Sequence, residues 1–273
     1  MKIQEFYDQT TGTFSYLIIC DTTNKVAIID SVADFDIVTA KISYEFVDRL
    51  ISYIQENNLE LEWILETHIH ADHLTAANYL KEKLGGKIAV NENFAKVKNY
   101  WAEFFDISLK DDAFDHFLKD GEVIKSGKIE MKIMLTPGHT PTCSSFIIKD
   151  NIFVGDVLLD PKIGCARCDF PGGSAEALYD SVQKIYAMDD EMNIYIGHDY
   201  PDNKGRERSN VKLKEHKENN ALIAANVDKE EFIKKRQDRD AKMKSPRLLL
   251  PSIQANINAG FVDGFIKLPV NKL

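Results

Sequence analysis

The stretch THIHADH (residues 67–73) places three histidines and one aspartate next to one another. It directly follows the apolar run EWILE, which is typical of a short buried strand. A solvated loop does not need three imidazoles, and a packed core would have to satisfy every ring nitrogen. In an extended segment His68 and His70 point the same way, and a turn into the next helix can bring Asp72 and His73 to a neighbouring point. The pattern therefore indicates a metal-binding loop at the end of a strand.

Three later segments offer further metal-capable side chains. Asp156 ends the apolar run IFVG, where a carboxylate is costly unless it is paired or bound to metal. His198 follows the run IYIG in the same way, and His139 lies in the rigid turn TPGHTP after another apolar run. Taken alone, His139 is typical of a surface turn. Because α/β proteins commonly gather ligands at strand ends, we expect all three to lie near His68.

Composition narrows the class of protein. The chain has 273 residues, 44% of them hydrophobic and 28% charged, which is ordinary for a globular protein. A net charge of −9 argues against a nucleic-acid partner but leaves an anionic small substrate open. No apolar run approaches the roughly 18–20 residues that a membrane span needs. The first residues lack the basic start and apolar stretch of a signal peptide, so we expect a cytoplasmic protein whose four cysteines are reduced thiols.

Hydrophobic periodicity predicts an α/β architecture. Strands are expected over Thr13–Cys20, Lys25–Asp30, Glu62–Glu66, Ile129–Leu135, Ser145–Lys149, Asn151–Val154 and Asn193–Ile196. Helices are expected over Ile42–Asn58, Leu74–Leu84, Glu92–Phe105 and Ala175–Met188, with a charged, mostly helical portion from about residue 206 to 242. No linker or internal repeat divides the chain, so we predict one domain over residues 1–273. This order of elements favours two packed sheets covered by helices, a four-layer α/β/β/α sandwich.

Taken together, the 67–73 motif followed by His139, Asp156 and His198 resembles the metallo-β-lactamase superfamily over nearly the whole chain. Within that superfamily, three features look like the persulfide dioxygenases: GCARCDFPGG (164–173), the HDY segment at His198, and Cys143 shortly after the His139 turn. The stretches YLKEKLGG and LPSIQANINAG are similar to the bacterial Blh branch, the β-lactamase-like hydrolase group. The residues DPKIGC (160–165), which lead into the GCARCDFPGG segment, differ from the sequence expected for that branch. Because they lie beside the presumed substrate pocket, the identity of the thiol carrier stays open.

The resemblance implies a reaction and a ligand set. Members of the family oxidise a low-molecular-weight persulfide, typically glutathione persulfide, with O2 and water to thiol and sulfite. One Fe(2+) per chain would be bound by His68, His139 and Asp156. Two histidines and one carboxylate leave coordination positions open, as non-haem iron oxygenases require. The remaining metal-capable residues would orient these ligands and hold water, or form a second metal site: His70, Asp72, His73 and His198.

For several further residues the sequence leaves two possible roles open. The resemblance suggests that Arg167 pairs with a substrate carboxylate and that Tyr200 hydrogen-bonds near the sulfur; the alternatives are a structural ion pair between Arg167 and Asp169, and rim packing for Tyr200. Asp30 either supports the histidine loop by hydrogen bonding or is a plain surface aspartate. We further predict that Cys165 and Cys168 are inert loop thiols. His116 and His216 are predicted to be surface residues.

The main rival is a dinuclear zinc thiolester hydrolase resembling glyoxalase II. Seven potential ligands are enough for two Zn(2+) ions with a bridging water, so ligand count does not separate the two activities. A non-catalytic sensor on the same fold would lack one or more ligands, and none is missing here. The apolar stretch Leu248–Leu250 suits a homodimer interface as well as a core.

Overall fold

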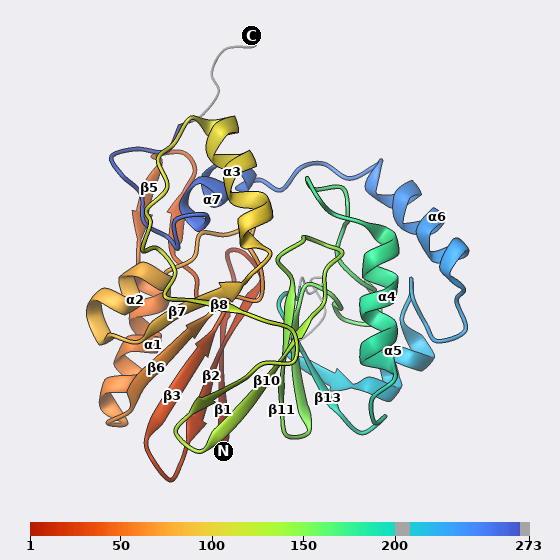
Figure 1. Ribbon diagram of the computed structural model, residues 1–273, viewed down its shortest axis with the longest axis horizontal. Coiled ribbons are helices and arrows are strands. Elements are labelled where there is room, and N and C mark those ends of the chain that lie inside the picture. The colour runs from red at the N-terminus through yellow and green to blue at the C-terminus, as the bar shows by residue number, and fades with distance from the viewer. Residues whose placement is uncertain (200–207, 268–273) are drawn as a thin grey trace.

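Two six-stranded sheets form the centre of the structure, a computed structural model that describes residues 1–199 and 208–267 (Figure 1). The first sheet holds, in spatial order, β1 (Lys2–Asp8), β2 (Thr13–Cys20), β3 (Lys25–Ile29), β6 (Glu60–Leu65), β7 (Lys87–Asn91) and β8 (His116–Leu118). The second holds β14 (Asn210–Lys212), β13 (Asn193–Ile196), β12 (Asn151–Gly155), β11 (Ser144–Ile148), β10 (Ile129–Leu135) and β9 (Val123–Ser126). A small hairpin of β4 (Asp34–Asp36) and β5 (Lys41–Ser43) stands apart from both.

Strand β2 shows how the two sheets pack. Its side chains alternate between faces, as in any strand. Tyr16 belongs to the core between the sheets, where it contacts the ring of Phe153 from β12. Leu17 and Ile19 belong to a separate core on the outer face of the first sheet. Both faces of β2 are buried along its whole length, so most of its residues are apolar, and its polar residues Thr13 and Ser15 are buried as well.

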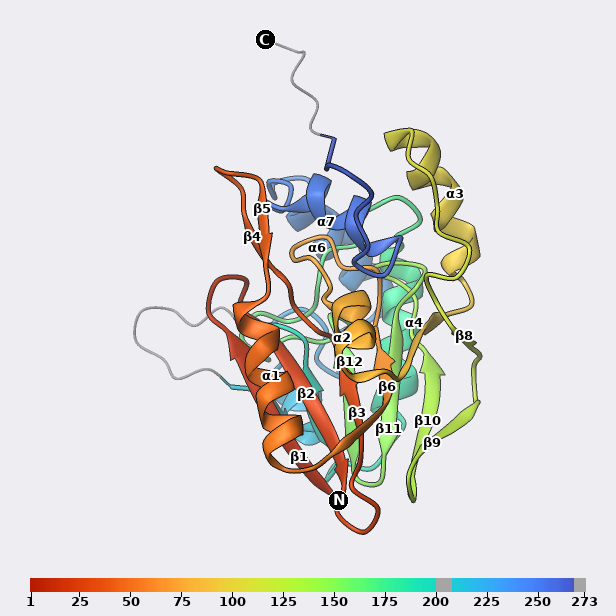
Figure 2. The same ribbon diagram turned by 90° about the vertical axis from the view of Figure 1, so that its left-hand side faces the viewer.

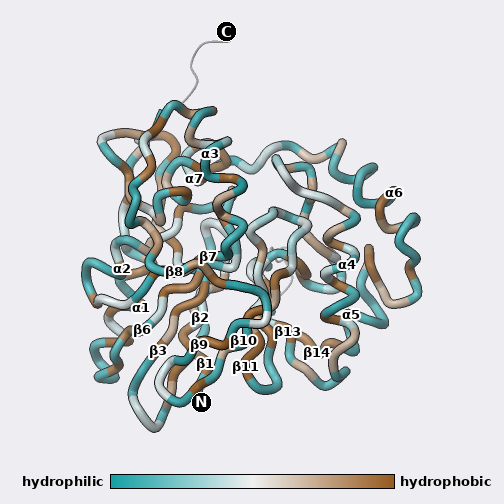
Figure 3. The backbone as a smooth tube through the Cα atoms, viewed as in Figure 1, coloured by the Kyte–Doolittle hydropathy of each residue, from teal (hydrophilic) through white to brown (hydrophobic). Residues whose placement is uncertain are grey.

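Helices cover the outer faces of both sheets (Figures 1 and 2). The first sheet is covered by α1 (Glu45–Glu56) and α2 (Ala77–Leu84), with α3 (Phe94–Phe105) and α7 (Leu249–Asn256) packed into the same core. The second sheet is covered by α4 (Ala175–Tyr186), α5 (Leu213–Asn219) and α6 (Lys229–Asp240). Hydrophobic positions recur along the strands of both sheets (Figure 3). The predicted four-layer α/β/β/α sandwich is therefore confirmed.

Most predicted elements are present, with shifts at their ends. The strands Ile129–Leu135 and Asn193–Ile196 match their predicted bounds. The helix expected over Ile42–Asn58 begins only at Glu45, because residues 41–43 pair with β4 instead. The helix expected from Leu74 begins at Ala77, because Leu74 forms a bridge to Ala33. The structure also has strands that were not predicted: β1, β4, β5, β7, β8, β9 and β14.

The C-terminal portion joins the two halves of the molecule. Within residues 208–242, the short strand β14 precedes the helices α5 and α6. The chain then leaves α6 beside the second sheet, crosses above both sheets and enters α7 beside the first (Figure 1). Of the stretch Leu248–Leu250, which we considered for a homodimer interface or a core, Leu248 is buried and Leu249 and Leu250 pack, partly buried, against the core of their own chain. None of the helices within residues 1–199 and 208–267 has the length and apolar character needed to cross a bilayer.

The prediction that His216 is a surface residue is wrong. It lies on the buried face of α5, and its carbonyl accepts a hydrogen bond from the hydroxyl of Tyr186 at 3.2 Å. Its charged neighbours Lys214 and Glu218 are exposed, whereas His216 itself is buried. Burial lowers the pKa of His216 to about 4. His116, by contrast, is partly exposed and lies 2.7 Å from Glu122.

Candidate metal centre

Strand ends from both sheets bring the candidate ligands together. His68 follows β6 of the first sheet, whereas His139, Asp156 and His198 follow β10, β12 and β13 of the second. The parallel pairing of β12 with β13 places the ends of those two strands at one edge. Hydrogen bonds then join the sheets at this edge: the amide of Ser144 donates to the carbonyl of Thr67 at 2.8 Å.

One group consists of two imidazoles and one carboxylate. A ligand atom from each of His68, His139 and Asp156 lies within 4.8 Å of the other two. Both histidines are buried, and the side chain of Asp156 is only 12% exposed. This is the donor set of non-haem iron sites that keep coordination positions open.

The hydrogen bonds of His68 determine which nitrogen carries its lone pair. The hydroxyl of Thr67 donates to Asp30 at 2.8 Å and lies 3.0 Å from Nδ1 of His68. Since its single proton goes to the carboxylate, this hydroxyl accepts a hydrogen bond from Nδ1–H of the imidazole. Nε2 of His68 therefore bears the lone pair, and it is buried without a hydrogen-bond partner among the described residues. Burial also lowers the pKa of His68 well below its usual value, which favours the neutral ring.

His139 is held in the same tautomer by a different partner. Its Nδ1 donates to the backbone carbonyl of Arg167 at 2.6 Å, and a carbonyl oxygen can only accept. Its Nε2 therefore bears a lone pair and lies 3.7 Å from Oδ2 of Asp156. The buried lone pair of His68 has no partner among the described residues, and the lone pair of His139 lies beside a carboxylate that cannot donate to it; a cation held by the three side chains would satisfy both. These three residues therefore fit a bound metal ion.

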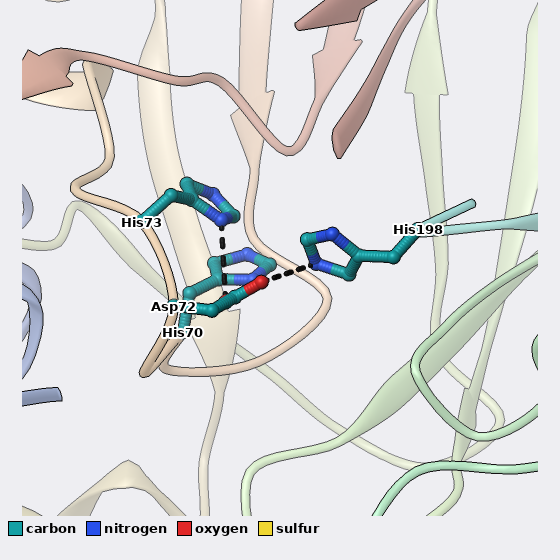
Figure 4. A group of neighbouring side chains, drawn as sticks. All are labelled: His70, Asp72, His73 and His198. Atoms are coloured by element: carbon teal, nitrogen blue, oxygen red, sulfur yellow. Dashed lines mark ion pairs between the residues drawn. The ribbon is translucent and has the colours of Figure 1, made fainter. Parts of the chain in front are cut away.

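A second group lies beside the first (Figure 4). Ligand atoms of His70, Asp72, His73 and His198 also lie within 4.8 Å of one another. The carboxylate of Asp72 lies 3.0 Å from Nε2 of His198 and 3.4 Å from Nδ1 of His73. Asp156 links the two groups, because its Oδ1 lies 3.5 Å from Nε2 of His198. The arrangement can hold one metal with a polar surround, or two metals.

Asp30 supports the histidine loop and is not a surface aspartate. It is buried and accepts hydrogen bonds from the amide of Thr67 at 2.7 Å and from Nε2 of His70 at 3.1 Å. Sequence reasoning missed a second carboxylate, Glu66, which lies 3.3 Å from the same nitrogen of His70 and accepts from the hydroxyl of Thr75 at 2.6 Å. A carboxylate at the end of an apolar strand was the available signal, as it was for Asp156.

A cavity of about 370 Å³ opens beside the metal-capable residues. Its lining includes His139, Asp156, Asp72 and His198, so both groups contribute to it. The remaining lining residues are Thr10, Thr11, Ala71, Leu159, Ala166, Arg167, Phe170, Met243, Lys244, Pro246, Arg247 and Leu248. A small molecule in this cavity would contact the candidate metal centre on one side and the chain between α6 and α7 on another.

Arg167 makes the structural ion pair that was its alternative interpretation. Its Nε and Nη2 donate to the two carboxylate oxygens of Asp169, each at 2.6 Å. Its Nη1 donates to the backbone carbonyl of Lys244 at 2.7 Å. Most of the guanidinium is therefore occupied, although the residue also lines the cavity. The other candidate substrate residue, Tyr200, lies outside the described residues.

The pair Cys165 and Cys168 flanks two residues that line the cavity, Ala166 and Arg167. Both thiols are reduced and buried. Burial raises the pKa of Cys165 to about 11 and raises that of Cys168 as well, so neither ionises near neutral pH. The buried Arg236 donates to the carbonyl of Cys165 at 3.0 Å and holds the loop in place. This chemistry agrees with inert loop thiols.

Comparison with known proteins gives the family. The model of the Metallo-beta-lactamase superfamily matches residues 9–198. "Glyoxylase B2" of Dictyostelium discoideum is 40% identical, and the match covers 100% of this chain and 98% of that protein. The "Beta-lactamase hydrolase-like protein" of Xylella fastidiosa (strain Temecula1 / ATCC 700964) is 36% identical, and the match covers 100% of this chain but 65% of that protein.

Two further matches concern persulfide dioxygenases. The human "Persulfide dioxygenase ETHE1, mitochondrial" is 30% identical over 72% of this chain and 68% of its own length. The crystal structure of ETHE1 from Myxococcus xanthus superposes with a TM-score of 0.79 at 29% identity, covering 96% of this chain and 100% of that one. The resemblance to persulfide dioxygenases and to the β-lactamase-like hydrolase group is thus confirmed. The family model matches more than half of this chain, and the chain has the fold of that family. The chain therefore belongs to the metallo-β-lactamase superfamily.

Proposed function

We propose that the protein is a persulfide dioxygenase. It converts a low-molecular-weight persulfide of the glutathione type, O2 and water into the thiol, sulfite and two protons. The observation that carries the proposal is the group of His68, His139 and Asp156, in which both imidazoles are preset to present Nε2 beside one carboxylate. The relatives named persulfide dioxygenase support it, and so does the close match to the Myxococcus xanthus structure.

These three side chains would hold one Fe(2+), which supplies open positions where a persulfide sulfur and oxygen can meet. The chain supplies the positioning. The hydroxyl of Thr67 and the carbonyl of Arg167 hold the two rings in the tautomer and orientation that a metal needs. Asp156 contributes the single negative charge of the ligand set, which balances part of the charge of a ferrous ion.

The second group has a role in the same reaction. Asp72 and His198 lie 3.0 Å apart and line the cavity beside Asp156. A carboxylate and an imidazole at this distance are suited to hold the water that the reaction consumes and to accept a released proton. The buried carboxylates of Asp30 and Glu66 both lie next to Nε2 of His70 and fix this imidazole. They thereby stabilise the loop that contains Asp72.

The alternative is a dinuclear zinc thiolester hydrolase of the glyoxalase II type. Two observations favour it: the second group of four ligands adjoins the first, and the Dictyostelium discoideum relative carries the name "Glyoxylase B2". In that enzyme the two groups, with Asp156 between them, would hold two Zn(2+) ions. Zinc would supply a water that is nucleophilic at neutral pH.

Metal analysis and two assays on one sample separate these activities. Protein purified without oxygen should contain about one iron per chain and take up oxygen only when glutathione persulfide is supplied, with sulfite accumulating. Asp156→Ala should abolish iron binding and oxygen uptake, whereas Asp150→Ala, in a turn far from the site, should change neither. Fast thiolester hydrolysis without oxygen uptake in an iron-replete sample would overturn the dioxygenase proposal in favour of the hydrolase.

A further inference from the structure

The side chain of Asn256, the last residue of α7, bonds to the backbone of the loop that carries three metal-capable residues. Its Nδ2 donates to the carbonyls of His70 and His73, each at 2.8 Å. Its Oδ1 accepts from the amide of Thr75 at 2.8 Å. A carbonyl can only accept and a backbone N–H can only donate, so the side-chain amide fits here in one orientation. Three hydrogen bonds from one side chain therefore end on residues 70–75.

These contacts satisfy backbone groups of buried residues. His70, His73 and Thr75 are each at most 3% exposed, and Asn256 itself is 2% exposed. Buried carbonyl and amide groups are costly without a partner. Two carbonyls that converge on one NH2 group also fix the curvature of the chain between them. The shape of this loop therefore depends on a residue that lies 186 positions after His70.

The curvature of the loop decides where its metal-capable side chains lie. His70, Asp72 and His73 lie together, with His198 opposite them from the other sheet (Figure 4). Asp72 lies 3.0 Å from Nε2 of His198, and the same nitrogen lies 3.5 Å from Oδ1 of Asp156. A change in the shape of the loop would therefore reach both groups of metal-capable residues.

A second amide on α7 has the same number of hydrogen bonds but a different target. Nε2 of Gln254 donates to the carbonyls of Leu250 and Lys267 at 2.9 and 2.8 Å, and Oε1 accepts from the amide of Lys267 at 2.8 Å. Gln254 is also buried, at 5% exposed. None of these partners belongs to residues 70–75 or to either metal-capable group. Gln254 and Asn256 thus allow the stability of α7 to be separated from its contact with the loop.

We propose that Asn256 is a positioning residue for the metal centre, through which the folding of α7 is coupled to metal affinity. The superfamily model matches residues 9–198, so this contribution comes from outside the matched stretch. Coupling between two sites is reciprocal, so a metal bound at the loop should in turn stabilise α7. The inference holds for one iron or two zinc ions, because both groups depend on the loop.

Competition with a chelator for Zn(2+), measured on the full metal-free chain, tests the first half of the proposal. Asn256→Leu keeps the size of the side chain and removes the three hydrogen bonds. We expect it to weaken Zn(2+) binding about 10–100-fold, as is typical when a residue that orients metal ligands is lost. Gln254→Met also removes three hydrogen bonds, so it should lower the urea midpoint while keeping the wild-type affinity for Zn(2+). Asn256→Ser retains one donor, should lose less affinity, and takes the place of Asn256→Leu if that variant does not fold.

Hydrogen exchange at saturating Zn(2+) tests the second half, with a readout that a loss of stability alone would not produce. In the wild type and in Gln254→Met, Zn(2+) should slow amide exchange in residues 249–256 as well as in residues 70–75. In Asn256→Leu the response of residues 249–256 should be lost. Unchanged Zn(2+) affinity in Asn256→Leu, an equal loss in Gln254→Met, or no response of α7 in the wild type would each overturn the inference. If oxygen uptake fails while these binding results hold, the proposed dioxygenase function falls and this inference stands.

Discussion

Replacing Thr67 with valine tests how the fold prepares the metal ligands. The hydroxyl of Thr67 donates to Asp30 at 2.8 Å and accepts from Nδ1 of His68 at 3.0 Å. Valine has nearly the same shape, so Thr67→Val removes these two hydrogen bonds without opening a cavity. Asp30 keeps the amide of residue 67 and the imidazole of His70 as partners. The substitution therefore isolates the contribution of one hydroxyl.

The loss of stability in Thr67→Val can be estimated from the buried polar groups that lose a hydrogen-bond partner. Each buried group that loses its partner costs about 1–3 kcal/mol. The partners that Asp30 retains limit its share, so Thr67→Val should lower the free energy of unfolding of the metal-free protein by about 2–4 kcal/mol. The ring of His68 also loses the contact that fixes its tautomer, and the loss of such a partner typically weakens metal binding about 10–100-fold. Both effects should appear together.

Urea unfolding followed by circular dichroism measures the first effect, and competition with a chelator measures the second. Thr67→Ser is the matched control, because it keeps the hydroxyl and loses one methyl group, at a cost of roughly 1 kcal/mol. It should retain metal nearly as tightly as the wild type. The reasoning is refuted if Thr67→Val retains metal with wild-type affinity, or if Thr67→Ser falls as far as Thr67→Val in both measurements.

Three further outcomes are expected. Gly138→Ala should lower the urea midpoint and weaken metal binding, because Gly138 has a φ of +150° and an added Cβ would lie 2.3 Å from Cα of Leu178. This residue precedes the candidate ligand His139, and an unchanged midpoint would contradict the geometry. The buried His216, whose pKa is lowered to about 4, binds a proton more readily when the chain is unfolded, so its contribution to stability is full above about pH 6.5 and is lost as the pH falls toward 4. Between pH 7 and pH 5 this loss is about 2 kcal/mol, and His216→Gln should flatten that part of the stability curve measured by urea unfolding. Arg167→Ala should release the segment at Lys244, seen as faster proteolysis there and weaker binding in the cavity; intact protease resistance would show that Leu248 alone anchors the segment.

The architecture and the candidate ligands were predictable because they depend on local sequence. Long apolar runs such as Thr13–Cys20 specify strands by residue type, whichever neighbours they acquire. The 67–73 motif likewise stands out because histidines and aspartate at the end of a strand have few purely structural roles. The strands that were missed, such as β1 (KIQEFYD), mix polar with apolar residues and take their form from pairing with a neighbour. Their own sequence provides little signal.

Only the tertiary structure decided how those residues are used. His216 has charged neighbours in sequence, and its burial depends on the surface that α5 packs against. The residue whose carbonyl accepts a hydrogen bond from Arg167 at the cavity edge, Lys244, lies 77 residues away in the chain. The tautomer of His139 depends on a carbonyl 28 residues away, and that of His68 depends on a proton that Thr67 gives to Asp30. Periodicity and composition describe a residue and its near neighbours, whereas hydrogen-bond direction and burial are set by groups that meet only when the chain is folded.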